Sequence, residues 1–236
     1  MKLDKYTYCA RFLPALIVLS PLLMVLFLLL PSIWKVLGAI CAAGLSASLI
    51  FLVAQCGRDM GKKKEAGLFE HLGGKPSVRL LRHSDSTLSP VTKQRYHAFL
   101  KANMEGFRLP TVQQESTDPV QADYIYDSAS DWLRARTRDK QVNELLLAEN
   151  TSYGFRRNLW AMKPVGVVIC LVILIAMDTM FIAGILPAVV TAKIALSIAA
   201  VMVAEIAFWM LVATPEWVAV PAIAYARTLL EYCDRS

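Results

Sequence analysis

The chain of 236 residues is 56% hydrophobic and 19% charged, with a formal net charge of +6 and a mean hydropathy of +0.45. Ordinary soluble domains are about 45–50% apolar, so this composition excludes a single soluble domain and predicts a membrane protein. The apolar residues are concentrated towards the two ends and the charged residues in the middle, which predicts a soluble insert between two membrane hairpins.

The first apolar run, residues 12–30, follows basic residues near the N-terminus, as the core of a secretory signal peptide does. We reject that interpretation because the run is longer than a typical signal-peptide core and has no persuasive cleavage site. A second apolar run, residues 33–54, follows after a short turn, so both runs are predicted to be membrane helices. The second run is rich in Gly, Ala and Ser, which predicts a face that packs closely against another helix.

Two further apolar runs, residues 165–186 and 193–213, complete the predicted membrane part. Each is long enough, at about 1.5 Å per residue, to cross a hydrocarbon core about 30 Å thick. The predicted fold class is therefore an all-α membrane protein, with four transmembrane helices as two hairpins flanking a mainly helical cytoplasmic insert. The predicted domains are an N-terminal hairpin (1–54), a basic helical insert (55–164), a C-terminal hairpin (165–214) and an interfacial tail (215–236).

Two acidic residues interrupt the C-terminal hairpin, Asp178 in its first helix and Glu205 in its second. An ionisable group at membrane depth normally faces the inside of a helix bundle or a water-filled cavity rather than lipid. Both residues are therefore candidates for lining a pore. The alternative is that they are protonated or hydrogen-bonded contacts between helices of a structural bundle, and the sequence leaves both interpretations open.

The insert begins with a segment in which Gly73, Gly74 and Pro76 interrupt any helix, so we expect a loop there. Its Gly-Gly-Lys sequence lacks the spacing of a phosphate-binding loop. Further on, Ser89 and Asp118 each precede a proline, which is the pattern of a helix N-cap followed by the first helical residue. The apolar residues after Asp118 have the spacing of an amphipathic helix. They are Ala122, Ile125, Tyr126, Ala129, Trp132 and Leu133.

Three arginines, Arg134, Arg136 and Arg138, follow at the end of that helix, where positive charge suits the helix dipole. Clusters of arginine bind the phosphate groups of nucleotides and oligonucleotides. They also occur as an ordinary solvated surface. The sequence makes these residues candidates for ligand binding or gating without deciding between the two interpretations.

The segment before the C-terminal hairpin, ENTSYGFRRNLWAMKP, places several polar side chains close to the predicted membrane surface. Trp160 belongs at the lipid–water interface and the neighbouring arginines near the lipid headgroups, so the segment is a predicted mechanical link between insert and hairpin. A basic membrane anchor with a helix cap explains the same residues. The candidates for ligand binding or gating in this segment are Tyr153, Arg156, Arg157 and Asn158.

Sequence signatures of catalysis and metal binding are missing. The three histidines, His71, His83 and His97, do not have the spacing of common zinc motifs, and the five cysteines form no CxxC pair. No GxSxG motif and no ordered Ser/His/Asp set occurs. We therefore predict no catalytic residue, no metal site and no cofactor, and we do not expect an enzyme.

The segments GGKPSVRLLRHSDS, TKQRYHAFL and ENTSYGFRRNLWAMKP resemble a family of small, mostly uncharacterised bacterial membrane proteins with the pattern GGxP…LLRHxD…KxRYH…YGFRRN. This resemblance covers about residues 60–165 and implies no activity. The layout of two spans, a basic insert and two further spans is also similar to the four-helix membrane effectors of bacterial anti-phage systems. That second resemblance implies an insert that senses a nucleotide or oligonucleotide signal, and membrane helices that act as a membrane-disrupting oligomer.

The leading hypothesis is thus a homo-oligomeric, pore-forming or membrane-disrupting effector of anti-phage defence in the bacterial inner membrane. Its expected partners are membrane lipids, further copies of itself, a nucleotide or oligonucleotide ligand and a partner signalling enzyme. The alternative is a transporter subunit or a membrane-anchored scaffold or sensor. Four spans are few for a transporter that acts alone, and the two hairpins show no internal repeat.

The distribution of positive charge predicts the topology. Lys and Arg outnumber Asp and Glu between residues 55 and 164, whereas the two short connecting turns hold few basic residues, so the insert and both termini are predicted to be cytoplasmic. A reporter that is active only outside the cytoplasm should be silent when fused after Ser236 or within residues 84–90. It should be active when fused near Pro31 or Pro187. Reporter activity at the insert would invert this topology.

Overall fold

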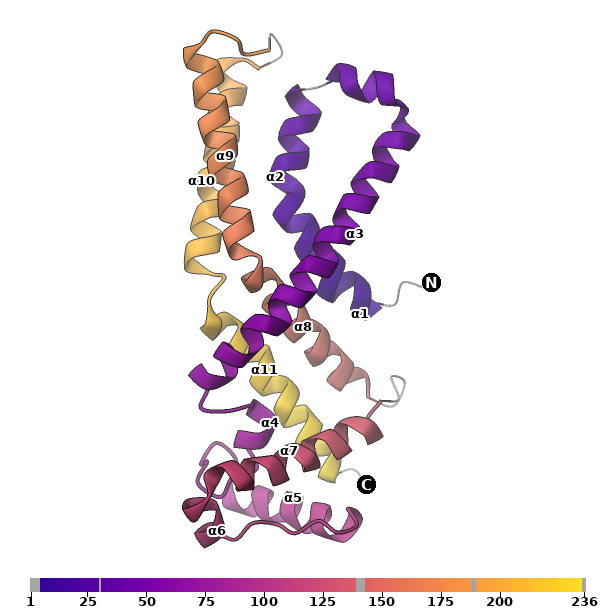
Figure 1. The fold of residues 1–236 in the computed structure, drawn as a ribbon, viewed down its shortest axis with the longest axis vertical. Helices are drawn as coiled ribbons and strands as arrows, with labels where there is room; N and C mark the ends of the chain where they lie inside the picture. Colours follow the sequence, from indigo (N-terminus) through magenta and orange to yellow (C-terminus); the bar gives the residue numbers. More distant parts are fainter. Residues whose placement is uncertain (1–4, 30, 139–142, 188–189, 235–236) are drawn as a thin grey trace. The chain divides into compact units, whose positions relative to one another are not determined.

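The computed structural model describes residues 5–29, 31–138, 143–187 and 190–234, and the side chains of residues 29–42 lie outside this description. Every regular element in the described ranges is a helix, so the all-α part of the predicted fold class is confirmed (Figure 1). The helical elements are α1 (Lys5–Thr7), η1 (Tyr8–Phe12), α2 (Leu13–Leu29), α3 (Pro31–His71), α4 (Pro76–Arg79), α5 (Pro90–Asn103), α6 (Val112–Thr117), α7 (Pro119–Arg136), α8 (Glu144–Ala161), α9 (Lys163–Ile182), α10 (Ala192–Leu211), α11 (Pro215–Leu230) and η2 (Glu231–Asp234).

The chain forms two compact units, which we call unit 1 and unit 2. Unit 1 contains Met1–Lys64 and Gly154–Val218, and unit 2 contains Glu65–Tyr153 and Ala219–Ser236. Three helices, α3, α8 and α11, contribute residues to both units. The predicted insert, 55–164, is thereby shared between the units, and the C-terminal end of the chain joins unit 2.

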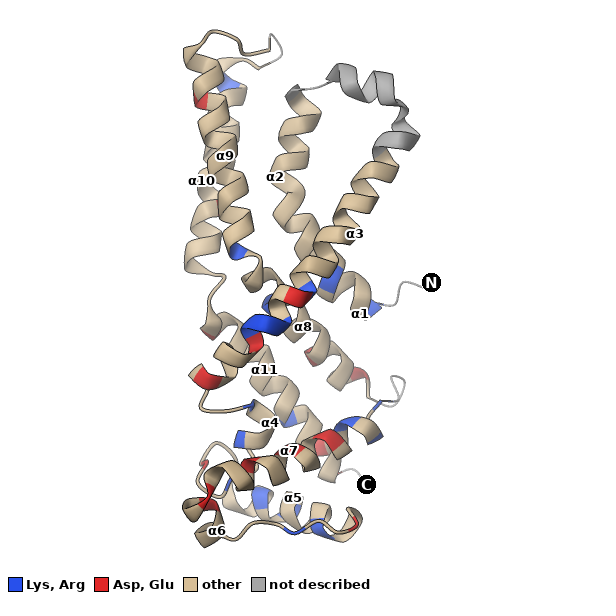
Figure 2. Cartoon of the chain, in the orientation of Figure 1, with Lys and Arg blue, Asp and Glu red and all other residues tan. Residues whose placement is uncertain are grey.

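Unit 1 contains the most apolar helices of the chain. α9 and α10 lie side by side as a hairpin, and α2 packs against α9 (Figure 1). Apolar residues from these three helices form one core cluster, and charged residues are sparse along the helices (Figure 2). Three stretches are long and apolar enough to cross a membrane: Lys5–Leu28, Lys163–Ile182 and Ala192–Leu211.

Three such stretches are found among the described residues where the sequence predicts four spans. The remaining predicted span, 33–54, lies within α3, and the side chains of its first part, up to residue 42, are outside the description. Leu30, the last residue of the first predicted span, is outside it as well. The arrangement of four spans in two hairpins therefore stays a prediction, while three apolar helices of spanning length are established.

Glycines on α3 allow a close approach between helices of unit 1. Gly57 and Gly61 lie one turn apart, and a Cβ atom added to them would lie 2.5 Å from the Met162 sulfur and 2.4 Å from Asn158 Oδ1, respectively. Two small residues four positions apart let a neighbouring helix contact the backbone. The sequence GRDMG thus packs α3 against the junction of α8 and α9.

Unit 2 is built around a core of apolar side chains that includes residues of α4, α5, α7, α8 and α11. The amphipathic helix predicted after Asp118 is α7, whose buried residues include Tyr126 and Leu133. The predicted N-cap is confirmed, because the Asp118 carboxylate accepts a hydrogen bond of 3.0 Å from the backbone N–H of Gln121. Ser89 caps α5 in the same way.

One local prediction is wrong. The chain before residue 90 is not one loop, because α3 continues to His71, and only then do Gly73 and Gly74, with φ values of 73° and 131°, end the helix. The Lys, Glu, Ala and Leu residues of this stretch favour a helix. In the predicted interfacial tail, 215–236, Leu229 and Leu230 of α11 are buried in the core of unit 2, and the position of the tail relative to a membrane stays a prediction. An amphipathic helix can bury its apolar face in protein as well as in lipid.

Gly166 on α9 offers a test of close packing in unit 1. A Cβ atom added there would lie 2.5 Å from the buried ring of Trp209 on α10, so Gly166→Ala should destabilise the hairpin by about 1–3 kcal/mol through overpacking. A lowered melting temperature of the detergent-solubilised chain would show this. Gly67→Ala is the matched control, since an added Cβ there meets nothing within 4 Å and alanine favours a helix over glycine. Equal melting temperatures for the two variants would contradict the observed packing.

Candidate functional site

The polar residues of unit 2 gather where the segment between α3 and α5 meets α6 and α7. At the end of α3, the backbone N–H of Gly74 donates to the carbonyl of Phe69 over 2.7 Å and closes the last turn. A Cβ atom added to Gly74 would lie 2.7 Å from Arg82 Nη2. Gly74 therefore both turns the chain and leaves room for an arginine beside the turn.

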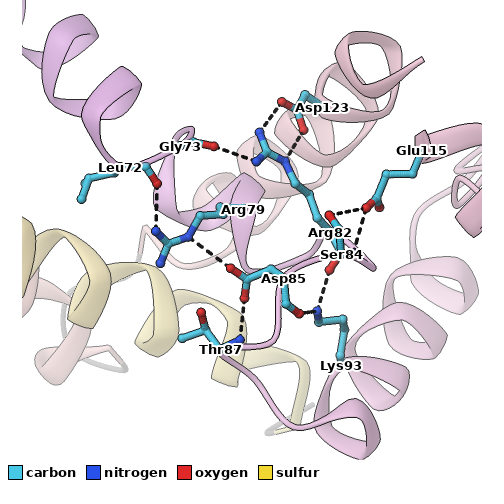
Figure 3. A network of polar contacts seen from close by, with 10 residues as sticks. All are labelled: Leu72, Gly73, Arg79, Arg82, Ser84, Asp85, Thr87, Lys93, Glu115 and Asp123. Carbon is cyan, nitrogen blue, oxygen red and sulfur yellow. Dashed lines mark hydrogen bonds and ion pairs between the residues drawn. The ribbon is translucent and has the colours of Figure 1, made fainter. Parts of the chain in front are cut away.

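Two arginines hold this segment in place (Figure 3). Arg82 donates to both carboxylate oxygens of Asp123 on α7, over 2.7 and 2.5 Å, and to the carbonyl of Gly73 over 2.7 Å. Arg79 on α4 pairs with Asp85, with 3.2 Å between Nε and Oδ2. Because a bidentate arginine–carboxylate pair is stronger and more directional than a single hydrogen bond, Arg82 sets the position of the segment against α7.

Glu115 of α6 is the centre of the network, and it is 6% exposed. It accepts four hydrogen bonds: from the backbone N–H groups of His83 (2.7 Å) and Ser84 (2.9 Å) and from the hydroxyls of Ser84 (2.7 Å) and Tyr126 (2.8 Å). Burial by itself raises the pKa of Glu115, but these hydrogen bonds outweigh burial and lower the pKa from 4.5 to about 2. Glu115 is therefore a carboxylate at neutral pH.

Lys93 of α5 approaches the same segment from the other side. It is 6% exposed, and its ammonium group donates to the carbonyls of Arg82, over 2.5 Å, and Asp85. Burial lowers the pKa of Lys93, while the charges of Asp85 and Glu115 oppose that change. The side chain thus acts as a clamp on the backbone between Arg82 and Asp85.

His83 and His97 lie together in unit 2, with ring centroids 5.0 Å apart and planes at 70°. The Nε2 atom of His97 lies 2.8 Å from the carbonyl oxygen of Leu81, and that of His83 lies 2.9 Å from the carbonyl oxygen of Pro110. Since a carbonyl can only accept, the Nε2 atom of each ring carries a proton. Burial lowers the pKa of His97, which keeps its ring neutral.

This network is the part of the site that the sequence analysis did not identify. His83 and His97 do not have zinc-motif spacing, and the segment before residue 90 is predicted only to be a loop. A signal was present, because the network draws on the segments LLRHSDS and TKQRYHAFL that carry the family resemblance. Lys93 and His97, four residues apart, also share one face of a helix.

The two acids of the hairpin lie at different depths of unit 1. Glu205 on α10 accepts a hydrogen bond from the thiol of Cys170 on α9 over 3.5 Å, which places it level with Cys170. Asp178 comes eight residues after Cys170 on α9, or about 12 Å further along the helix axis, and it is exposed. The structure therefore does not bring Asp178 and Glu205 into direct contact.

The three predicted ligand-binding arginines lie in the last turn of α7 and just after it. Arg134 pairs with Asp131, and the Arg136 guanidinium lies 4.1 Å from the ring centroid of Trp132. Arg138 follows the end of α7, and all three arginines are exposed. Ligand binding by these residues stays a prediction.

The predicted residues of α8 form contacts within their own units. In unit 2, the Tyr153 hydroxyl donates to Glu65 over 2.5 Å. This hydrogen bond joins the first residue of unit 2, Glu65 on α3, to the part of α8 that belongs to unit 2. The contact explains the placement of Tyr153 without a ligand.

In unit 1, Arg156, Arg157 and Asn158 tie α8 to its neighbours. Arg156 donates to the carbonyl of Trp217 over 3.0 Å and lies 5.0 Å from that ring's centroid. Asn158 is 2% exposed, accepts hydrogen bonds from Arg157 over 3.2 and 3.1 Å, and donates to the carbonyl of Ala10 over 2.7 Å. Ala10 belongs to the π-helical turn η1, so Asn158 fixes an irregular turn of the N-terminal helix.

No group of three or more His, Cys, Asp or Glu residues within the described ranges is placed to hold a metal ion. Comparison with known proteins finds no matching protein-family model, no similar curated protein and no similar solved structure. The function of the chain therefore has to be inferred from its residues and their geometry.

Replacing Glu115 by Gln should loosen the segment at residues 80–90, because an amide cannot accept from all four donors. The expected cost is about 2 kcal/mol, typical of hydrogen bonds to a charged group. Hydrogen–deuterium exchange of the full-length protein should then be faster at the backbone N–H groups of His83 and Ser84. Glu105→Gln, which changes an exposed carboxylate, is the control and should leave that exchange rate unchanged.

The low pKa of Glu115 also predicts acid sensitivity. Because the folded-state pKa of about 2 lies below the ordinary value of 4.5, the contribution of Glu115 to stability is full above about pH 5 and is lost as the pH falls through about 2. The melting temperature of the wild-type chain should therefore fall more steeply than that of Glu115→Gln between pH 5 and pH 2. Parallel curves for the two proteins would contradict the charged, hydrogen-bonded state of Glu115.

Proposed function

We propose that this chain is a multi-pass protein of the bacterial inner membrane that self-associates through the α9–α10 hairpin and opens a pore or otherwise disrupts the membrane. The observation that carries the proposal is Asp178, a carboxylate exposed on the surface of an otherwise apolar helix of spanning length. A carboxylate at membrane depth is costly against lipid and normally faces protein or water. In a homo-oligomer, the faces of neighbouring hairpins supply both.

The hairpin surface beside Asp178 suits a second copy of the same hairpin. A groove of about 520 Å³ lies next to Asp178 between α9 and α10. On the α10 side it is lined by Ala192, Ala195 and Ala199, whose small side chains let another helix approach closely. The same groove contains Phe181 and Leu196, both largely exposed in a single chain. A homo-oligomer would cover these side chains.

Glu205 supports an ion path as well as a structural role. Its contact with Cys170 spans 3.5 Å, so the carboxylate is held by one weak donor. Together with Asp178, it places acidic groups at two depths of one hairpin, about 12 Å apart along the axis. Rings of such acids, repeated around an oligomer, favour cations in a pore.

Control by the soluble part follows from the connection between helices. α8 ends at Ala161 and α9 begins at Lys163, with Met162 alone between them. Because no flexible linker separates the two helices, a rotation or shift of α8 would also move α9. We propose that a nucleotide or oligonucleotide, made by a partner signalling enzyme in anti-phage defence, binds the soluble part and shifts α8. Arg134, Arg136 and Arg138 are exposed and stay candidates for contacts with such a ligand, although Arg134 pairs with Asp131 and Arg136 lies over the ring of Trp132.

Charge-neutral variants of the acids test the pore. The isosteric changes Asp178→Asn and Glu205→Gln keep shape and hydrogen bonding but remove charge, so the double variant should assemble normally and conduct cations at least about tenfold less in liposome flux assays. Ser197→Ala, which removes a polar side chain from the same hairpin without changing its charge, should conduct like wild type.

Two results would decide against this function. Wild-type flux through a well-assembled Asp178→Asn, Glu205→Gln double variant would rule out a charge-lined pore. No flux and no change of membrane potential on expression of the wild-type chain would favour the alternative, a transporter subunit or a membrane-anchored scaffold or sensor. Size-exclusion chromatography with light scattering provides the assembly state for both comparisons.

A further inference from the structure

Unit 2 contains a cavity of about 610 Å³ beside the two histidines. One wall is a single face of α5, and the other is formed by residues 83–86, Leu88 and Leu109. Cavities of about 300–1,000 Å³ are the size class that binds small organic ligands. The residues of the α5 wall recur at the three- and four-residue spacing of one helix face. They are Pro90, Lys93, Gln94, His97, Ala98 and Lys101.

The charged groups at this cavity differ in whether they are already engaged. Asp85 pairs with Arg79 over 3.2 Å and accepts from the backbone N–H of Thr87 over 2.8 Å. Lys93 already donates to two backbone carbonyls. Lys101, in contrast, is exposed and forms no ion pair with any residue in the described ranges. Its charge is therefore available to an anion, and the one lining carboxylate is already neutralised.

The rest of the lining favours a flat ligand with hydrogen-bond donors. His97 lines the cavity, and its Nδ1 atom is an acceptor, because burial keeps its ring neutral and its Nε2 proton is donated to the carbonyl of Leu81. Leu88 and Leu109 contribute apolar surface. A fitting ligand combines an apolar ring that carries N–H donors with an anionic group.

We infer that this cavity binds a nucleoside monophosphate. The two histidines would contact one side of the base, the apolar side chains would contact the other, and Lys101 would bind the phosphate. A nucleobase has apolar faces and N–H donors at its edge, and its phosphate supplies the anion. The choice of a nucleotide over another organic anion rests on the proposed function. The inference assigns that ligand to a site that does not include Arg134, Arg136 or Arg138.

Direct binding measurements on the full-length protein in nanodiscs test this site. The probes are AMP, GMP, CMP and UMP, with adenosine and inorganic phosphate as separate arms, measured by isothermal titration calorimetry. At least one monophosphate should bind at least about tenfold more tightly than adenosine or phosphate alone, since a charge-assisted contact is worth about that much. Lys101→Ala should weaken its binding about tenfold, and Ala98→Trp, which fills the cavity without removing a polar group, should abolish it.

Arg95→Ala is the matched control, because Arg95 is an exposed cation on the same helix that pairs with Asp234 rather than lining the cavity. Its affinity should equal that of wild type. No binding of any monophosphate at 1 mM, or equal affinity in wild type and Ala98→Trp, would overturn the inference. Inorganic phosphate binding as tightly as the nucleotides would overturn the ligand class. If the wild-type chain binds a nucleoside monophosphate but conducts no ions, the proposed function is wrong and the binding site is retained.

Discussion

The free-energy cost of moving charged groups out of water constrains the fold of this protein, because a buried ionisable group without partners destabilises the folded state by several kcal/mol. In unit 2 the requirement is met by Glu115, which accepts four hydrogen bonds, and by Lys93, which donates to two carbonyls. Because all of those partners except Tyr126 of α7 lie in the segment between α3 and α5, satisfying the two charges also determines the path of a segment that has little regular structure of its own. The cavity wall beside α5 is a consequence of that path.

The ionisable side chains that form no ion pair in the described structure are the most informative about function. Asp178 is exposed on an apolar hairpin, and Lys101 is an exposed lining residue of a cavity whose other charges are engaged. Neither residue contributes an ion pair to the described structure. Asp178 is poorly suited to lipid, and Lys101 is well suited to an anion. We propose that a second copy of the chain contacts the hairpin at Asp178 and that a ligand binds at Lys101.

The connection between α8 and α9 relates these two regions along the chain. Met162, the single residue between the helices, is buried against Gly57 of α3, and Asn158 holds the π-helical turn through Ala10. α8 is thus anchored at its end in unit 1, while Tyr153 contacts Glu65 in unit 2. The proposed control of the hairpin by a ligand that moves α8 would pass through this short and well-packed junction.

The sequence by itself determined the properties that depend on neighbouring residues. The apolar stretches, the N-caps at Ser89 and Asp118 and the buried face of α7 follow from length, spacing and local hydrogen bonding, and each could be predicted. Only the tertiary structure decided where amphipathic or polar segments found their partners: the tail buries Leu229 in unit 2 rather than in lipid, and Glu115 meets Ser84 and Tyr126. The physical reason is that an apolar face or a buried charge requires a partner but does not specify one, and the partner is chosen by the path of the whole chain.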